Sequence, residues 1–291
     1  MFKDRRASVS RGVWCTDPAT LRLAMDNEVE DPKGSWALEP GDRARGFAVT
    51  AAGTAIIPII GVMTKGESMF TMFGAGTSSL ATRQAVRAAV ADESVSSILL
   101  FVDSPGGEVA GIDELAEEVR AANREKPVFA FVEDEGASAA VWVASQAQQV
   151  FSNKMAAVGS IGVFAVVTDA SQAMEEAGVK VHVISTGDFK GGAFGAEVSE
   201  GKLAEVQRMV DAINVEFKGA VKKGRSMTAK AVDAIADGRM FTAPEAQSLG
   251  LTDGVSTIEK VLGAMDKEVR ARGRARRARA TAAQLNIDKR K

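Results

Sequence analysis

Short apolar runs that alternate with amphipathic stretches constrain the fold of this chain more than any other feature. The run SILLFVD (97–103) is apolar almost throughout, which is typical of a strand buried on both faces of a parallel sheet. A glycine turn and the amphipathic stretch EVAGIDELAEEVRAAN (108–123) follow it. The same order recurs where PVFAFVE (127–133) leads into GASAAVWVASQAQ (136–148). We therefore expect an α/β fold with a mostly parallel sheet.

This alternation occupies the middle of the chain and divides it into three parts. Residues 1–46 are polar and interrupted by proline and glycine, so we expect an N-terminal arm. Residues 47–262 form the α/β domain, and residues 263–291 form a basic tail. Residues 267–291 hold ten Lys and Arg against two acidic residues and show no apolar stripe, so the tail is expected to be disordered. Such a tail can bind an acidic partner or simply remain solvated.

Histidine is almost absent, which limits the kinds of catalysis open to the chain. The single histidine, His182, lies in VKVHVIS (179–185), where alternation predicts a strand with buried valines and an outward-facing histidine. A serine hydrolase normally uses histidine to activate its hydroxyl, and lysine is the known substitute. If this chain activates a serine, we expect lysine to be the base.

Cysteine usage and apolar run lengths indicate a cytoplasmic protein without a metal or other cofactor. Cys15 is the only cysteine, so an internal disulfide is excluded, and no Cys/His cluster has zinc-ligand spacing. The longest apolar run near the N-terminus, AIIPIIGVM (55–63), is far shorter than the roughly 20 residues of a membrane helix. No export signal is recognisable, and we expect no membrane anchor.

Ser138 is the candidate nucleophile. It lies in GASAA (136–140), at the predicted start of a helix that follows a strand, where free N–H groups favour developing negative charge. The small neighbours leave room for a peptide substrate. From local sequence alone, the interpretation of Ser138 as an N-terminal capping residue is favoured over a catalytic one, because such caps are common.

Lys190 is the candidate base, in the glycine-rich stretch GDFKGG (187–192). An ordinary lysine has a pKa of about 10.4 and is almost entirely charged at pH 7, so a catalytic role requires burial. Phe189 and Phe194 could supply an apolar wall, and Asp188 would have to point away. The alternative is a solvated loop lysine.

Two consecutive glycines, Gly106 and Gly107, follow the buried strand in DSPGGEVAG (103–111). Without side chains, their backbone N–H groups can approach a ligand and form an anion pocket. A tight strand-to-helix turn explains the same pair equally well.

Taken in order, these motifs resemble the signal peptide peptidase A family of Ser/Lys serine peptidases, which share the Clp protease/crotonase spiral fold. The resemblance covers about residues 50–262. It is carried by DSPGG (103–107), GASAA (136–140), VGSIGV (158–163), GDFKGG (187–192) and ADGRMFTAPEAQSLGLTDGV (236–255).

The resemblance implies a role for each site residue. Ser138 would be the nucleophile and Lys190 the general base of a Ser/Lys dyad, with Ser160 orienting the lysine amine. Backbone N–H groups of Gly107 and Ala139 would form the oxyanion hole, with Gly106 supporting the turn. The small members of the family close into rings whose neighbouring subunits complete each active site, so the resemblance also implies a homo-oligomer, in which Ser138 can meet Lys190 of an adjacent subunit.

Within that family the chain looks most like the phage-encoded proteases of capsid assembly and head maturation, which process scaffold or portal proteins. A bacterial cytoplasmic protease similar to signal peptide peptidase is the first alternative. A mainly structural assembly factor, with the basic tail as its working part, is the second. An acyl-CoA hydratase-like enzyme is disfavoured, because no paired carboxylates accompany GASAA.

Overall fold

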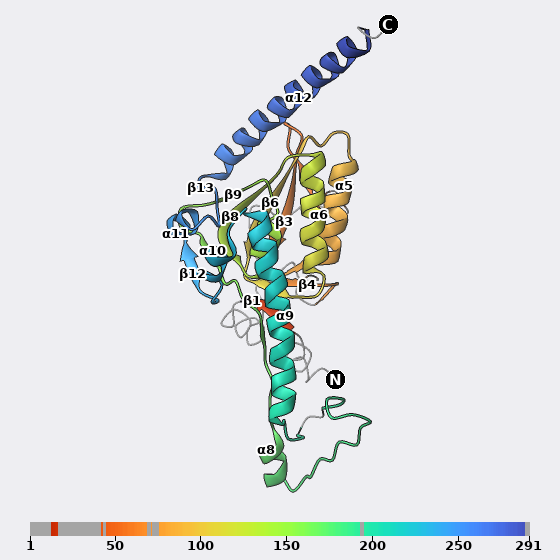
Figure 1. Ribbon diagram of the computed structural model, residues 1–291, viewed down its shortest axis with the longest axis vertical. Coiled ribbons are helices and arrows are strands. Elements are labelled where there is room, and N and C mark those ends of the chain that lie inside the picture. The colour runs from red at the N-terminus through yellow and green to blue at the C-terminus, as the bar shows by residue number, and fades with distance from the viewer. Residues whose placement is uncertain are drawn as a thin grey trace.

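A computed structural model describes residues 13–16, 42, 45–68, 71, 76–192 and 195–288. Two β-sheets and the helices around them form the body, from which two long helices project in opposite directions (Figure 1). Most of the predicted arm, residues 1–46, lies outside the described residues.

The larger sheet carries the strands that the apolar runs predict. Its spatial order is β12 (Met240–Thr242), β10 (Ala157–Gly159), β8 (Val128–Ala137), β6 (Ser97–Ser104), β3 (Thr54–Ile60) and β2 (Ala48–Val49). Beside the first half of β8 lies β9 (Gln149–Ser152), which also pairs with β13 (Gly254–Val255). Strands β3, β6, β8, β9 and β10 pair in parallel, whereas β2 and β12 are antiparallel to their neighbours. The predicted α/β fold with a mostly parallel sheet is confirmed.

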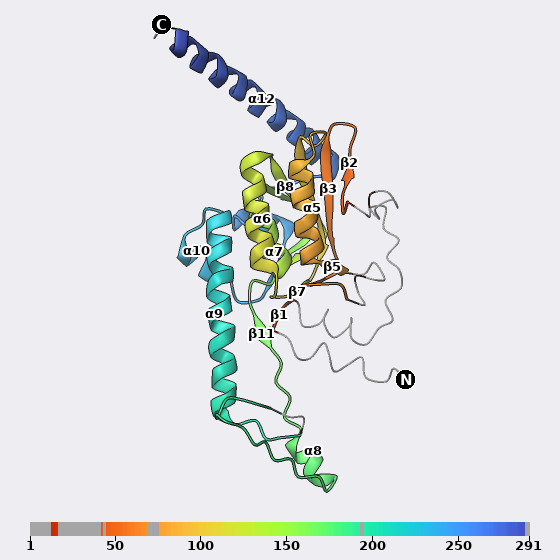
Figure 2. The same cartoon turned by 90° about the vertical axis from the view of Figure 1, so that its right-hand side faces the viewer.

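Both faces of this sheet are covered, which explains why its strands are apolar on both sides. Helices α5 (Ser79–Ala91), α6 (Ile112–Glu125) and α7 (Ala139–Ala144) pack on one face (Figure 2). The first turns of α12 (Ile258–Asp288) cover the other, where Val261 and Met265 contact apolar side chains of β6 and β8. Alternate residues along each strand therefore serve two separate cores.

A smaller sheet lies at the end of the larger one from which the site residues emerge. Its order is β11 (Phe164–Ala165), β1 (Val13–Thr16), β7 (Gly106–Glu108), β4 (Val62–Thr64) and β5 (Gly76–Ser78). It joins strands from distant parts of the sequence. Among the described residues, β1 is the only contribution of the first 46 to this sheet.

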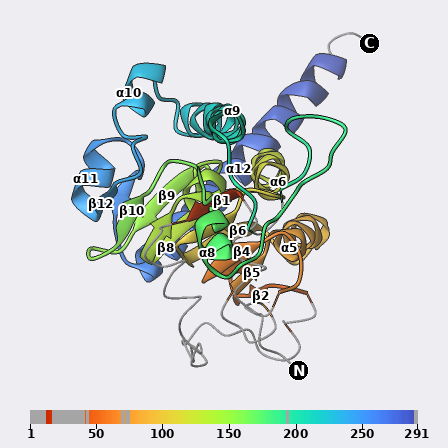
Figure 3. The same cartoon turned by 90° about the horizontal axis from the view of Figure 1, so that it is seen from below.

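Residues 166–192 and 195–212 form a projection from the body. Helix α9 (Glu200–Gly224) leads away from the sheet, and α8 (Ser171–Glu176) lies at its far end with the connecting residues 177–192 and 195–199 (Figures 1 and 3). The strand predicted at 179–185 is wrong, since this segment has no regular structure. Val179 and Val183 are 49% and 39% exposed. Alternation alone cannot make a strand where the described part of the chain supplies no neighbouring strand to pair with it.

The C-terminal part returns to the body through α10 (Ala229–Asp233) and α11 (Ala243–Ser248) before α12 begins. Thr242 and Glu245 form a capping box at the start of α11. No helix in the described part of the chain is both long and apolar enough to cross a bilayer.

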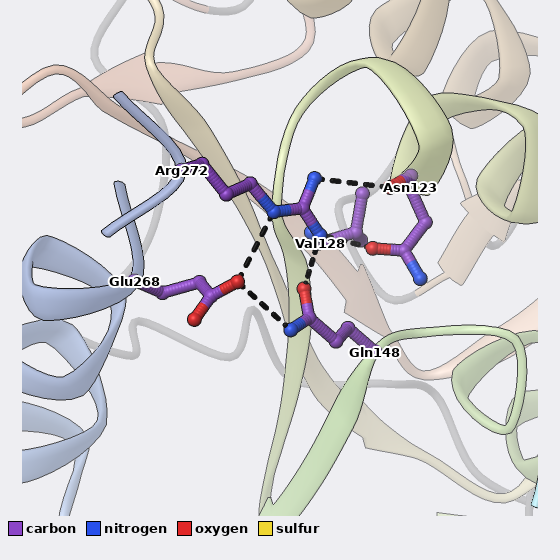
Figure 4. Close-up of polar contacts among 5 residues, drawn as sticks. All are labelled: Asn123, Val128, Gln148, Glu268 and Arg272. Atoms are coloured by element: carbon purple, nitrogen blue, oxygen red, sulfur yellow. Dashed lines mark hydrogen bonds and ion pairs between the residues drawn. The ribbon is translucent and has the colours of Figure 1, made fainter. Parts of the chain in front are cut away.

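The tail, expected to be disordered, is instead helical as far as Asp288. Alanine and arginine are both strong helix formers, and the packed start of α12 removes the cost of nucleating a new helix. Arg272 also fixes the helix to the body. Its guanidinium donates hydrogen bonds to Glu268, to the side chain of Gln148 and to the carbonyl of Asn123 (Figure 4).

Candidate active site

Ser138 stands at a sharp turn between β8 and α7. Its φ of 53° and ψ of −117° lie outside the regions that L side chains favour, so the backbone here is strained. Two backbone hydrogen bonds of Ser138 fix this conformation. The Ser138 N–H donates to Gly159 O at 2.8 Å, and the Trp142 N–H donates to Ser138 O at 3.0 Å.

The hydroxyl of Ser138 is buried and has no hydrogen-bond partner in the described part of the chain. The residue is 1% exposed, and its side chain makes no capping bond to α7. The capping interpretation of Ser138 is therefore wrong. A buried polar atom without a partner costs free energy, and a sharp strand-to-helix turn with serine at its apex also occurs in hydrolases with a nucleophilic serine, so Ser138 is a candidate nucleophile.

Ser160 lies beside Ser138 because their strands are neighbours. Gly159, the last residue of β10, is paired in parallel with Ala137, the last residue of β8, so each serine directly follows a paired position. Ser160 also has a φ of 53° and is 7% exposed. Its N–H donates to Arg239 O at 2.8 Å. Ser138 and Ser160 are therefore two buried serines with positive φ, each directly after the last paired residue of one of two neighbouring strands.

Gly107 is required for close packing. A Cβ at this position would lie 1.8 Å from the carbonyl oxygen of Met63 on β4, so no other residue fits without moving the backbone. Gly106 has a φ of 90° and donates its N–H to Ser104 Oγ at 3.2 Å. The glycine pair therefore makes a tight turn and also lies close to Ser138, because β7 packs against α7, which starts at Ala139.

Ala139 is fully buried at the first position of α7. The first N–H groups of a helix have no acceptor within that helix. The Ala139 N–H is therefore in a suitable place to stabilise negative charge next to the Ser138 hydroxyl.

An irregularity in β8 sets the direction of its last residues. The register with β6 shifts between the pairs Val102–Val132 and Ser104–Gly136. The side chain of Asp103 compensates for backbone hydrogen bonds missing at this shift, because its Oδ1 accepts the Glu135 N–H at 3.1 Å. Burial raises the pKa of Asp103, the Glu135 hydrogen bond opposes this rise, and the negative charge of Asp134 adds to it. Bulges of this kind often redirect a strand beside a functional site.

Lys190 is not brought to Ser138 within the chain. It is exposed, in the segment 177–192 at the far end of α9 (Figure 1). Phe189 is 66% exposed and so forms no apolar wall over the lysine. Asp188 is exposed as well, and Phe194 lies outside the described residues. His182 is exposed on the same segment, so the only histidine is also absent from the serine site.

Two parts of the site, Arg239 and strand β1, were not predicted from the sequence. Arg239 holds Ser160 through its backbone carbonyl, and its place in the motif ADGRMFTAPEAQSLGLTDGV was the only signal. Strand β1 pairs with β7 directly at Gly106 and Gly107, and nothing in the local sequence of residues 13–16 indicated this. Within the described residues, no group of three or more His, Cys, Asp and Glu side chains is placed to hold a metal ion.

Comparison with known proteins gives a consistent result. Residues 120–272 match the model of Peptidase family S49. A protein of Methanocaldococcus jannaschii, named for an inferred protease activity, is 33% identical over 178 residues, which are 60% of this chain and 57% of the relative. Protease 4 of Salmonella typhi is 29% identical over 220 residues, 73% of this chain and 34% of the relative.

A phage protein covers more of the chain. Capsid assembly protease C of Escherichia phage lambda is 27% identical over 250 residues, which are 84% of this chain and 54% of the relative. The chain spans about half the length of the curated relatives it matches.

Proposed function

Because the chain belongs to peptidase family S49, we propose that it is a serine endopeptidase in which Ser138 is the nucleophile and Lys190 the base. The observation that carries the proposal is the buried, unpartnered hydroxyl of Ser138 on strained backbone at the start of α7. Strain at such a residue persists only when the surrounding structure enforces it, which is typical of functional sites.

The reaction follows from the roles of four groups. Neutral Lys190 takes the proton of the Ser138 hydroxyl while Oγ attacks the substrate carbonyl carbon, and the N–H groups of Gly107 and Ala139 bind the resulting oxyanion. The Lys190 ammonium then gives its proton to the departing amine, leaving an acyl-enzyme. Lys190 next takes a proton from water while the water oxygen attacks the ester carbon, and the ammonium then returns that proton to Ser138 Oγ as the C–O bond breaks and the carboxylic acid product leaves. Ser160 orients the amine throughout.

In this proposal the lysine comes from a second copy of the chain. Lys190 is exposed in a single chain, whereas a neutral amine requires burial. Exposed apolar side chains accompany it on the projection, and a neighbouring subunit would bury them. They are Val166, Val167, Val179, Val183, Ile184 and Phe189, of which Ile184 is 98% exposed. We expect a ring of identical subunits in which each projection reaches the serine site of its neighbour.

The substrates of this proposed peptidase are head proteins of a phage, such as scaffold or portal proteins. Support comes from the lambda capsid assembly protease, whose match extends over 84% of this chain. A Head-tail preconnector protein of Enterobacteria phage P21 also matches, at 27% identity over 217 residues. The alternative is a cytoplasmic protease that degrades signal peptides.

A comparison of single variants tests the proposal. Ser138→Ala and Lys190→Ala should each lower peptide cleavage by about 10³-fold or more, because each removes half of the unit that activates the hydroxyl. Lys180→Ala is the matched control, since Lys180 is an exposed lysine of the same projection, and it should retain activity. Mass spectrometry of candidate head proteins and of synthetic signal peptides after incubation measures both activity and substrate class.

Retained cleavage in Ser138→Ala would contradict the assignment of the nucleophile. Cleavage of signal peptides but of no head protein would favour the alternative substrate. Circular dichroism of each variant shows whether the fold is retained.

A further inference from the structure

Strand β1 lies inside the smaller sheet, between β11 and β7, although it comes from the N-terminal part of the chain. It runs antiparallel to β7, with Thr16 opposite Gly106, Cys15 opposite Gly107 and Trp14 opposite Glu108. On its other side it runs antiparallel to β11, where Trp14 is opposite Phe164 and Val13 opposite Ala165. Figure 2 shows β1 between the two strands, at the base of the body.

Both neighbours of β1 are connected to the serine site, one by packing and one along the chain. Strand β7 carries Gly106 and Gly107 and packs against α7, whose first residue follows Ser138. Strand β11 begins four residues after Ser160. In the described sheet, β7 and β11 are joined only through β1. Without β1, the edges of β7 and β11 would face one another across the gap that β1 now fills, each with unpaired backbone groups.

Two facing strand edges select an extended peptide. Such a peptide adds as a new strand and gains main-chain hydrogen bonds that depend little on its sequence. The position that β1 fills is therefore the position in which a polypeptide substrate would lie. The register also brings the backbone around Cys15 opposite Gly107, the proposed oxyanion donor.

We propose that residues Val13–Thr16 are a built-in inhibitor that occupies the substrate strand of the site and must leave before a polypeptide can be cleaved. The inference rests on the proposed peptidase function. A segment tethered to the same chain competes at an effective concentration in the millimolar range, which exceeds that of most free substrates. A scaffolded assembly or a high local concentration of substrate would be needed to displace it.

A proline in β1 tests this inference in the full-length chain. Cys15→Pro removes a backbone N–H and cannot be accommodated in a strand that is paired on both sides. Cys15→Ala is the matched control, because it changes the side chain and keeps the backbone pairing. We expect Cys15→Pro to raise kcat/KM for a short peptide substrate about tenfold or more over Cys15→Ala.

Hydrogen exchange supplies a readout that does not depend on cleavage. Amides of residues 13–16 should exchange at least about tenfold more slowly in Cys15→Ala than in Cys15→Pro, since only the paired strand is protected. A synthetic peptide with the sequence of residues 11–18, RGVWCTDP, should inhibit the Cys15→Pro variant competitively. The same peptide with proline in place of Cys15 should not inhibit.

The results separate the two proposals. If Cys15→Ala cleaves the peptide and Cys15→Pro cleaves it no faster, the inhibitor role is overturned while the peptidase function stands. Unprotected amides at 13–16 in Cys15→Ala would overturn it too. If Cys15→Pro cleaves the peptide equally well with Ser138 and with Ser138→Ala, the peptidase assignment itself has failed.

Discussion

At the scale of single residues, the site combines strain with burial at Ser138. A backbone conformation with φ of 53° and ψ of −117° costs a residue with a Cβ about 1–3 kcal/mol, whereas glycine adopts positive φ freely. This conformational strain is the free-energy cost of placing a serine hydroxyl, and not a glycine, at the turn between β8 and α7. A protein optimised for stability alone would place glycine at this position.

Comparing alanine with glycine at position 138, and then at position 139, measures this strain. We expect Ser138→Gly to be more stable than Ser138→Ala by about 1 kcal/mol, after allowing for the greater freedom of glycine in the unfolded chain. Ala139→Gly applies the same change one residue further on, inside α7, and should be destabilising by about 0.5–1 kcal/mol. Urea unfolding followed by circular dichroism gives both differences. Equal signs at the two positions would contradict the strain argument.

At the scale of elements, the junction between α7 and α9 connects the serine turn to the projection. Trp142 of α7 and Phe217 of α9 are stacked, with ring centroids 4.8 Å apart and planes inclined by 13°. At the end of α9, a Cβ on Gly224 would lie 2.2 Å from the Ser145 carbonyl oxygen. The helices approach so closely that only glycine fits.

Two glycine-to-alanine substitutions in α9 should therefore have opposite effects. Gly224→Ala forces α9 away from α7 and should be destabilising by about 1–3 kcal/mol, as for other overpacked sites. Gly219 lies on the same helix, and a Cβ added there would meet no described atom beyond its own helix within 4 Å. Gly219→Ala should therefore be stabilising by about 0.5–1 kcal/mol. Thermal and urea unfolding of the two variants check this, and a stabilising Gly224→Ala would show that the junction can open without cost.

The same scale shows which features were predictable from sequence. The strands at 97–103 and 127–133 and the helix in the stretch that begins with GASAA depend on local patterns, and all are present. The segment 179–185 has the alternating pattern of a strand, but in the described part of the chain no neighbouring strand pairs with it, so the prediction from the local pattern was wrong. The tail was expected to be disordered because it lacks an apolar stripe, yet α12 continues from its packed first turns.

The site was only partly predictable for a related reason. Motif order singled out Ser138 and Ser160 as candidates, and the structure places them side by side after paired strand positions, while their catalytic roles stay predictions. The pairing of β1 with β7 joins residues about 90 positions apart, and such a contact leaves no local signal in one sequence. The place of Lys190 depends on a projection whose apolar side chains stay exposed in the single chain.

At the scale of the whole molecule, the distance between the two halves of the proposed dyad is set by α9. The helix has 25 residues and is therefore about 37 Å long, and it is anchored to the body near its C-terminal end by Phe217 and Val221. The segment that carries Lys190 lies beyond its other end (Figure 1). A dyad within one chain would require this helix to fold back, whereas a dyad between copies uses the projection as it stands.

Mixing two inactive variants distinguishes these arrangements. Ser138→Ala keeps its lysine and Lys190→Ala keeps its serine, so co-expressed in equal amounts they can form intact sites only between subunits. With random assembly, half of the serines and half of the lysines are functional, and about a quarter of the wild-type activity should return. Analytical ultracentrifugation of the mixture must show the same oligomer as the wild type. If that oligomer forms and no activity returns, serine and lysine act within one chain, and α9 would have to bend to bring them together.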